Sequence, residues 1–281
     1  MVEVKKIQSL YFSPTGNTRK ILEAISEGIG LPTIKDIDLT LPKQRETWSD
    51  TTEGDLIIVG VPVYRGTFPA VILPYLKKLN GSNKLAIPVA VCGNVRMGTC
   101  LAEMCGILRK QNFTILAAGN FIGQHSFVTD DYHLGVGRPD ENDLRKAREF
   151  GRRIGMKLEA ADFNDITSFH AGNCFIRLYV NGNPDAQGSG LPERWHPLIK
   201  VSVVDHGKEN CSHCKICAES CPTGAINVDT LQIDDVNCLR CFACVSACPL
   251  ELVRKVVSYD SELDSWFKLQ QKYRGEPLVF L

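Results

Sequence analysis

Cysteine is the residue type whose spacing carries the clearest chemistry in this sequence. The chain of 281 residues contains 12 cysteines, and eight of them lie between Cys211 and Cys248. This clustering is too uneven for a disulfide framework spread over a secreted chain. The eight form two runs of the same spacing, C-x2-C-x2-C-x3-C-P, which consist of Cys211, Cys214, Cys217 and Cys221, and of Cys238, Cys241, Cys244 and Cys248. Four thiolates at such spacing are ligands for iron–sulfur clusters or for zinc.

The two runs resemble those of bacterial two-cluster ferredoxins, in which the fourth cysteine of a run ligates the other cluster. The resemblance implies two 4Fe-4S clusters with crossed ligands, namely Cys211, Cys214, Cys217 and Cys248 for one, and Cys238, Cys241, Cys244 and Cys221 for the other. Zinc is the alternative, because C-x2-C pairs also bind zinc. Two identical runs that each end in proline favour clusters. The second run continues as "CPLELV" where the first continues as "CPTGAI", which predicts different packing near Cys248.

A different chemistry is indicated by "SPTGNT", which lies between a strand-like run and a helix-like pattern. Backbone N–H groups and the positive end of a helix meet in such a loop, where they bind anions. The loop offers hydroxyl donors, a glycine that permits close approach and an asparagine that tolerates unusual dihedral angles: Ser13, Thr15, Gly16, Asn17 and Thr18. It therefore predicts a phosphate monoester site, with helix capping by Thr15 or Asn17 as the alternative. The chain has no Walker loop and no complete dinucleotide fingerprint.

Strand-like and helix-like segments alternate through the first part of the chain. Strands are expected at 4–12, 33–39, 55–61, 85–92 and 113–121. Helices are expected at 18–30, 69–79, 99–111 and 140–160. Such alternation predicts an α/β fold with a doubly wound, five-stranded parallel sheet. Because proline cannot donate to a sheet ladder, we expect Pro88 near the start of its strand.

The phosphate-loop sequence resembles the flavodoxin loop, Ser/Thr-x-Thr-Gly-x-Thr. This resemblance implies a flavodoxin-like domain with strand order 2-1-3-4-5 and FMN at the switch point of the sheet. It also implies that the loops after the third and fourth strands contact the flavin ring. The residues expected in these two ring loops are Pro62, Val63, Tyr64, Arg65, Gly66, Cys92, Gly93, Asn94 and Arg96.

Several residues near the expected flavin leave two interpretations open. Tyr64 offers an aromatic face for stacking, with packing in the core as the alternative. Gly66 permits a turn with positive φ. The second ring loop has Arg96 between valine and methionine where flavodoxins often have an aromatic residue, so the outer stacking partner is not identified. His125, in "GQHSF", is either a proton donor or a polar surface residue, and we assign no catalytic residue.

The sequence divides into four predicted segments. These are a flavodoxin-like domain at 1–160, a linker or surface loop at 161–200, a small α+β ferredoxin-like two-cluster domain at 201–258 and a helical tail at 259–281. The amphipathic helix of the tail is expected to dock on its own chain. The cysteines outside the two runs are interpreted as free thiols without a metal: Cys92, Cys100, Cys105 and Cys174.

Composition limits the classes of function. Lys+Arg and Asp+Glu both total 32, so no basic excess suggests a nucleic acid or an anionic membrane as partner. No run of about 18 apolar residues is present to span a bilayer. The N-terminus has no apolar signal core, so we expect a cytoplasmic protein.

Together the two parts resemble the flavodoxin–ferredoxin fusion proteins of anaerobes. The resemblance implies an electron-transfer protein that passes electrons between two 4Fe-4S clusters and FMN, because a flavin takes one or two electrons and each cluster takes one. The alternative is a flavin-dependent oxidoreductase that reduces a small substrate, with Arg96 and His125 as candidate anchors. A purely structural iron–sulfur module leaves the phosphate loop unexplained. The expected partners are a reductase, a hydrogenase or a ferredoxin-linked enzyme, and the sequence leaves a homodimer open.

Overall fold

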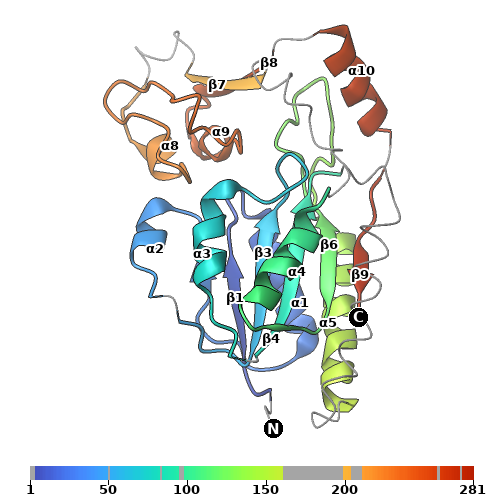
Figure 1. The fold of residues 1–281 in the computed structure, drawn as a ribbon. Coiled ribbons are helices and arrows are strands. Elements are labelled where there is room, and N and C mark those ends of the chain that lie inside the picture. Colours follow the sequence, from blue (N-terminus) through green and yellow to red (C-terminus); the bar gives the residue numbers. More distant parts are fainter. Residues whose placement is uncertain are drawn as a thin grey trace.

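The first half of the chain folds around a mostly parallel sheet with helices on both faces (Figure 1). The computed structural model describes residues 4–49, 51–82, 84–94, 98–160, 199–203, 211–257, 260–272 and 274–281. The strands of this sheet are β1 (Ile7–Tyr11), β2 (Ile37–Asp38), β3 (Leu56–Pro62), β4 (Leu85–Cys92), β5 (Thr114–Ile115), β6 (Ala118–Ile122) and β9 (Leu278–Phe280). The helices of the same half are α1 (Asn17–Ile29), α2 (Pro42–Glu46), η1 (Ala70–Ile72), α3 (Leu73–Lys78), α4 (Cys100–Lys110) and α5 (Glu141–Ala160).

The strand order β2-β1-β3-β4-β6 is that of flavodoxin, and each of these pairings is parallel. The flavodoxin-like class expected from the sequence is confirmed. A further edge strand, β9, pairs antiparallel with β6 and places Phe280 opposite Ala118. This strand lies within the segment for which the sequence predicts a helical tail. The tail is therefore helical only in its first part, and its end extends the sheet.

The last predicted strand of the sheet is divided into β5 and β6, and this division explains Pro88. The carbonyl of Ala86 accepts a hydrogen bond of 3.0 Å from the N–H of Leu116. The backbone N–H and C=O groups of every second residue of β4 therefore point toward β5 and β6. Pro88 faces the same side, at the gap between these two strands. No ladder hydrogen bond is needed from its nitrogen there. The expectation that Pro88 lies near the strand's start is wrong, because it is in the middle of β4.

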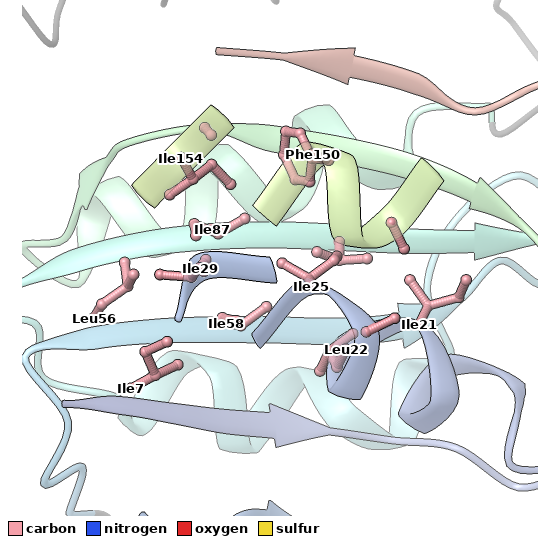
Figure 2. Close-up of a cluster of buried hydrophobic side chains, with 14 of the residues drawn as sticks. Ile7, Ile21, Leu22, Ile25, Ile29, Leu56, Ile58, Ile87, Phe150 and Ile154 are labelled. Carbon is pink, nitrogen blue, oxygen red and sulfur yellow. The ribbon is translucent and has the colours of Figure 1, made fainter. Parts of the chain in front are cut away.

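Apolar side chains cover both faces of the sheet. Helices α1 and α5 pack on one face, where Ile25, Ile58 and Phe150 are buried (Figure 2). These two helices pack very closely at Gly151, where an added Cβ would lie 2.2 Å from the carbonyl oxygen of Ile25. Helices α3 and α4 cover the opposite face with a second core that includes Met104. The sheet is thus buried on both sides, as a doubly wound fold requires.

The C-terminal half forms a smaller unit over the carboxyl edge of the sheet (Figure 1). Its described elements are β7 (Ile199–Val203), α8 (Ile216–Glu219), α9 (Ala243–Ala247), β8 (Val253–Val257) and α10 (Ser261–Gln270). Strands β7 and β8 pair antiparallel. Strand β7 begins before the end of the predicted linker, most of which lies outside the described residues. The four segment limits stay predictions.

A third apolar core joins the two halves. It combines side chains of the segment after β6, of the cysteine-rich region and of α10: Tyr132, Leu134, Phe242, Val253, Leu263 and Phe267. Helix α10 is capped by Asp260, whose Oδ1 accepts hydrogen bonds from the N–H groups of Glu262 and Leu263 at 3.1 and 2.7 Å. Leu263 and Phe267 are fully buried, which confirms that the amphipathic helix docks on its own chain. In the part of the chain that the structure describes, no helix is long and apolar enough to cross a membrane.

Candidate cofactor sites

The loop Ser13–Thr18 lies between β1 and α1 and presents unpaired N–H groups. The helix begins after Gly16, which has φ of 81° and adds no side-chain cap, so capping by Thr15 or Asn17 is not what this loop does. Within the described part of the chain, the N–H groups of Thr15, Asn17 and Thr18 donate to no acceptor. Three such donors at the positive end of a 13-residue helix are suited to binding an anion.

Neighbouring hydrogen bonds hold the loop in place. The N–H of Ser13 donates to Thr40 Oγ1 at 2.9 Å, and the N–H of Arg19 donates to Ser13 Oγ at 3.1 Å. Because Ser13 Oγ accepts from the backbone, its own hydroxyl hydrogen is directed elsewhere. The loop is therefore fixed from behind, and a hydroxyl is available to a bound anion.

A cavity of about 520 Å³ adjoins this loop, within the size range of small-molecule sites. Most of the predicted flavin residues line it: Ser13, Thr15, Asn17, Thr18, Pro62, Val63, Tyr64, Arg65, Gly66, Cys92 and Gly93. Gly16 and Asn94 are adjacent in sequence to residues that line the cavity, but they do not line it themselves. Arg96 lies outside the described residues. We call this cavity the flavin cavity.

The first ring loop is a tight turn tied to α4. Tyr64 and Thr67 exchange backbone hydrogen bonds of 2.8 and 3.2 Å, and Gly66 has the positive φ expected for it, 79°. The carbonyl of Gly66 accepts from the N–H groups of Thr99 and Cys100 at 2.8 and 3.1 Å. These contacts position the tyrosine on the cavity wall.

Tyr64 is partly buried and lies between the flavin cavity and the cysteine-rich region. Burial, and next the sulfur of Cys241, raise the pKa of Tyr64 well above its usual value, while the side chain of Ser126 lowers it. The phenol is therefore protonated at neutral pH. Its position between the two regions is compatible with stacking and does not support core packing alone.

His125 also lines the cavity, as a neutral side chain. Its Nδ1 accepts a hydrogen bond of 3.0 Å from the N–H of Phe127, which leaves the ring proton on Nε2. Burial, and next the ammonium group of Lys255, lower the pKa of His125 to about 4. Its ring centroid is 6.3 Å from that of Trp266 in α10. His125 is partly buried on the cavity wall, and at neutral pH it carries no charge.

The eight cysteines of the two runs gather around two small cavities. Cys211, Cys214, Cys217 and Cys248 line the first, which we call the distal cavity. Cys221, Cys238, Cys241 and Cys244 line the second, the proximal cavity. In each case three cysteines come from one run and the fourth from the other. The structure thus brings together the crossed sets that the ferredoxin resemblance implies.

The donor set of each cavity suits an iron–sulfur cluster. Backbone N–H groups donate to the fourth cysteines, from Ala225 to Cys221 Sγ at 3.2 Å and from Leu252 to Cys248 Sγ at 3.4 Å. Hydrogen bonds to the sulfurs are a usual means of adjusting cluster potentials. Burial raises the pKa of Cys241 to about 12, so a bound metal must replace its proton.

The flavin cavity and the proximal cavity share a wall. Cys238 and Leu239 line both of them. Asp235, Val236 and Arg240 complete this side of the flavin cavity. Arg240 holds the segment by donating to the carbonyls of Cys238 and Asp235 at 3.0 and 3.3 Å. Sequence reasoning missed this wall, because no local pattern shows which residues the other half of the chain brings to a site.

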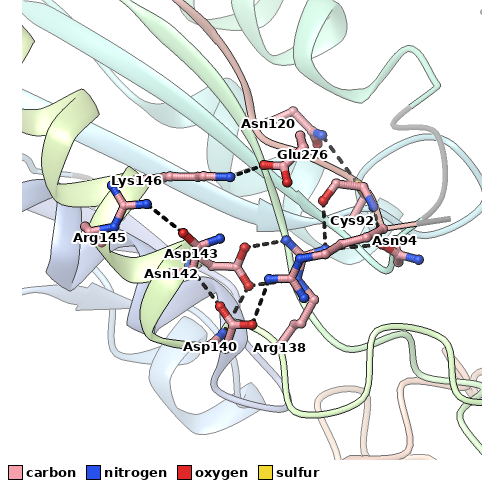
Figure 3. A network of polar contacts seen from close by, with 12 residues as sticks. Cys92, Asn94, Asn120, Arg138, Asp140, Asn142, Asp143, Arg145, Lys146 and Glu276 are labelled. Atoms are coloured by element: carbon pink, nitrogen blue, oxygen red, sulfur yellow. Dashed lines mark hydrogen bonds and ion pairs between the residues drawn. The ribbon is translucent and has the colours of Figure 1, made fainter.

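The second ring loop is held by a polar network that includes the C-terminal tail (Figure 3). Asn94 Oδ1 accepts a hydrogen bond of 3.2 Å from Arg138 Nη1. Arg138 also forms a buried ion pair with Asp143, and it donates to the carbonyl of Gly275 at 2.8 Å. Lys146 of α5 pairs with Glu276 nearby. The network fixes Asn94, although this residue does not line the flavin cavity.

The cysteines outside the two runs differ in their surroundings. Cys100 and Cys105 are buried between α4 and the sheet. Cys92 is also buried and lines the flavin cavity, where Asn120 Nδ2 donates to its sulfur at 3.4 Å. Burial raises the pKa of all three thiols. Cys174 lies outside the described residues.

The cysteine-rich region matches a known protein family. Residues 204–249 match the family model described as a 4Fe-4S dicluster domain. This match supports two 4Fe-4S clusters in the C-terminal half. The comparison with curated proteins gives no match.

Solved structures similar to this chain cover its first half. A flavodoxin from the domain Archaea is 18% identical, with a TM-score of 0.42, over 55% of this chain and 99% of that one. Rubredoxin oxygen:oxidoreductase from the anaerobe Desulfovibrio gigas is 15% identical, with a TM-score of 0.41, over 56% of this chain and 37% of that one. The two-electron reduced flavodoxin of Megasphaera elsdenii is 14% identical, with a TM-score of 0.36, over 53% of this chain and 98% of that one. The flavodoxin-like fold of this half is defined by its strand order.

The strand order and the dicluster match together define the class of protein. A flavodoxin-like domain is joined to a ferredoxin-type dicluster region within one chain. This is the architecture of a flavodoxin–ferredoxin fusion.

Proposed function

We propose that this chain is an electron-transfer protein in which two 4Fe-4S clusters exchange electrons with FMN. The phosphate loop supports a terminal phosphate, since the N–H groups of Thr15, Asn17 and Thr18 have no acceptor among the residues that the structure describes. Ser13 adds a hydroxyl. The ring loops would hold the flavin ring, with Tyr64 as the aromatic contact. FMN supplies a centre that takes one or two electrons.

The crossed cysteine sets would hold the clusters. The distal cluster belongs to the cavity of Cys211, Cys214, Cys217 and Cys248, and the proximal cluster to that of Cys221, Cys238, Cys241 and Cys244. Cys214 is exposed, whereas Cys241 and Cys244 are buried. Electrons would therefore enter at the distal cluster from a protein partner and continue inward.

The observation that carries this proposal is the shared wall of Cys238 and Leu239. A proximal-cluster ligand forms part of the boundary of the flavin cavity within the same chain. Clusters of this type are strong reductants, so electrons would move from the proximal cluster to the flavin. Transfer needs no second copy of the chain in this arrangement. A homodimer and a cytoplasmic location stay predictions, and the partner would be a reductase, a hydrogenase or a ferredoxin-linked enzyme.

A second candidate is a flavin-dependent oxidoreductase that reduces a small substrate. One observation favours it, because neutral His125 lines the flavin cavity with its Nε2–H as a donor. The other candidate anchor, Arg96, is not among the described residues. The carrier function needs no substrate contact, and we favour it.

Stopped-flow reduction by a low-potential ferredoxin-type donor tests the proposal. The wild-type chain should contain about eight iron, eight acid-labile sulfide and one FMN, following the ligand count of two four-cysteine sites. Cys214→Ala should slow the reduction of the flavin, whereas Cys105→Ala, which changes a buried thiol of α4, should not. Equal rates in all three proteins would show that the clusters do not feed the flavin.

A further inference from the structure

Arg45 is a buried cation at the junction of the two halves. Three arginines are almost fully buried among the described residues, and their exposed fractions are 7% for Arg45, 4% for Arg138 and 7% for Arg240. Arg138 is paired with Asp143, and Arg240 lies 3.7 Å from a carboxylate oxygen of Asp235. Arg45 has no carboxylate partner in the described part of the chain.

The guanidinium of Arg45 instead binds three carbonyl groups. Its Nη1 donates to the carbonyls of Leu39 and Thr40 at 2.9 and 2.7 Å. Its Nη2 donates to the carbonyl of Pro222 at 2.6 Å, across 177 residues of sequence. Its geometry is therefore fixed by hydrogen bonds from both halves of the chain.

The carbonyl groups that Arg45 binds are close in sequence to residues of both proposed anionic cofactor sites, the proximal cluster and the FMN phosphate. Pro222 follows the ligand Cys221 and lines the proximal cavity. On the other side, Thr40 Oγ1 accepts from the N–H of Ser13, the first residue of the phosphate loop. Arg45 thus connects the wall of the proximal cavity to the support of the phosphate loop.

Three carbonyl groups and the ring of Tyr75, whose centroid lies 6.0 Å from the guanidinium carbon, offset part of the cost of burying this cation. A nearby negative charge would offset more of it. An iron–sulfur cluster with four thiolate ligands is anionic, and so is a phosphate. We infer that Arg45 is a positioning residue that supplies the counter-charge of the proximal cluster, an inference that rests on the proposed function. Net charge around a cluster is one of the factors that set its reduction potential.

The sign of the effect follows from charge. Reduction adds one negative charge to a cluster, so the positive charge of Arg45 stabilises the reduced proximal cluster and raises its potential. The distal cavity has Lys215 among its lining residues, but that side chain is exposed and its charge is screened by solvent. Arg45 therefore raises the potential of the proximal cluster in addition to any effect of Arg240, which is also buried beside the ligand Cys238. A higher proximal potential favours the passage of electrons from the distal side toward the flavin.

A redox titration followed by electron paramagnetic resonance on the intact, cofactor-loaded chain tests this inference. The variants are Arg45→Gln and Arg45→Met, which remove the charge, and Arg45→Lys, which keeps it. Arg148→Gln is the control for overall charge, because Arg148 is a surface residue paired with Glu27 and Glu141. The signal that changes in Cys241→Ser identifies the proximal cluster.

Both neutral variants should shift the proximal potential to more negative values and leave the distal potential unchanged. Arg45→Lys should shift it by less than half as much, and Arg148→Gln should not shift it. The inference is overturned by an unchanged proximal potential in a folded neutral variant, by equal shifts of both clusters, or by an equal shift with lysine. Arg45→Met provides the neutral comparison if Arg45→Gln does not fold. The iron, sulfide and FMN contents of the wild type test the proposed function separately. A wild-type chain that lacks the clusters or FMN would contradict the proposed function, whatever the role of Arg45.

Discussion

Asn94 Oδ1 accepts a hydrogen bond of 2.7 Å from the N–H of Gly275, a residue 181 positions further along the chain. The contact ties the second ring loop to the C-terminal tail. The same tail contributes β9 to the edge of the flavodoxin-like sheet and α10 to the core shared by both halves. The chain after the cysteine-rich region therefore returns to stabilise the flavin side of the molecule.

The buried ion pair between Arg138 and Asp143 should contribute most to the stability of the polar network around Asn94. Asp143 is fully buried and pairs with Arg138, so Asp143→Asn leaves a buried guanidinium without its counter-ion. We expect a loss of about 3 to 5 kcal/mol in the free energy of unfolding. Denaturant unfolding measures this value. Glu141→Gln is the control on the same helix, because Glu141 pairs with Arg148 at the surface, and it should change little. Equal stabilities of the two variants would contradict the role of the network.

Thr15→Ala should weaken FMN binding without changing the iron content. Thr15 is in the phosphate loop and lines the flavin cavity, but it lines neither of the two cysteine cavities. Loss of one hydrogen bond to a charged group corresponds to about 1.5 to 3 kcal/mol of binding free energy. Fluorescence titration of the flavin-depleted chain gives this number. Thr47→Ala, at the end of α2, is the control. Unchanged affinity, or FAD as the extracted cofactor, would show that the phosphate assignment is wrong.

His125 predicts a specific pH dependence of stability. Its pKa is about 4 in the folded chain, against an ordinary value of 6.5. The unfolded state binds more protons between these values, so stability is complete above about pH 6.5 and is lost as the pH falls toward 4. The expected contribution is about 2 kcal/mol between pH 6.5 and pH 5. Unfolding of the wild type and of His125→Gln at both pH values isolates it, and parallel curves would contradict the assignment.

The crossing of the two cysteine runs can be tested by one substitution. Cys221 belongs to the first run in sequence but lines the proximal cavity with Cys238, Cys241 and Cys244. Cys221→Ser should therefore disturb the proximal cluster and leave the distal one intact. Paramagnetic resonance of the reduced chain separates the two signals. Damage confined to the distal signal, assigned with Cys214→Ala, would refute the crossing.

Local patterns predicted the parts of the site that depend on neighbouring residues. The loop Ser13–Thr18 and the cysteine spacing are such patterns, because each needs only a short stretch of chain around one ligand. The alternation of strands and helices likewise gave the sheet. Pro88 was placed wrongly, since its position depends on the break between β5 and β6 rather than on its own strand.

The parts that could not be predicted depend on contacts between distant segments. Strand β9 has three residues, and it forms because the edge of β6 is available to pair with it. The placement of Cys238 on the flavin cavity depends on how the two halves meet. A linker between two domains raises the effective concentration of one at the other. The structure adds direct contacts between them, such as that of Lys255 Nζ with the carbonyl of Val128 at 2.6 Å.

We propose that the proximal cluster reduces the flavin within one chain. The most direct measurement is the rate of flavin reduction after rapid photochemical reduction of the clusters, over about a tenfold range of protein concentration. The shared wall of Cys238 and Leu239 predicts a first-order rate that does not change with concentration. A rate that rises in proportion to protein concentration would show transfer between separate molecules and would contradict the account.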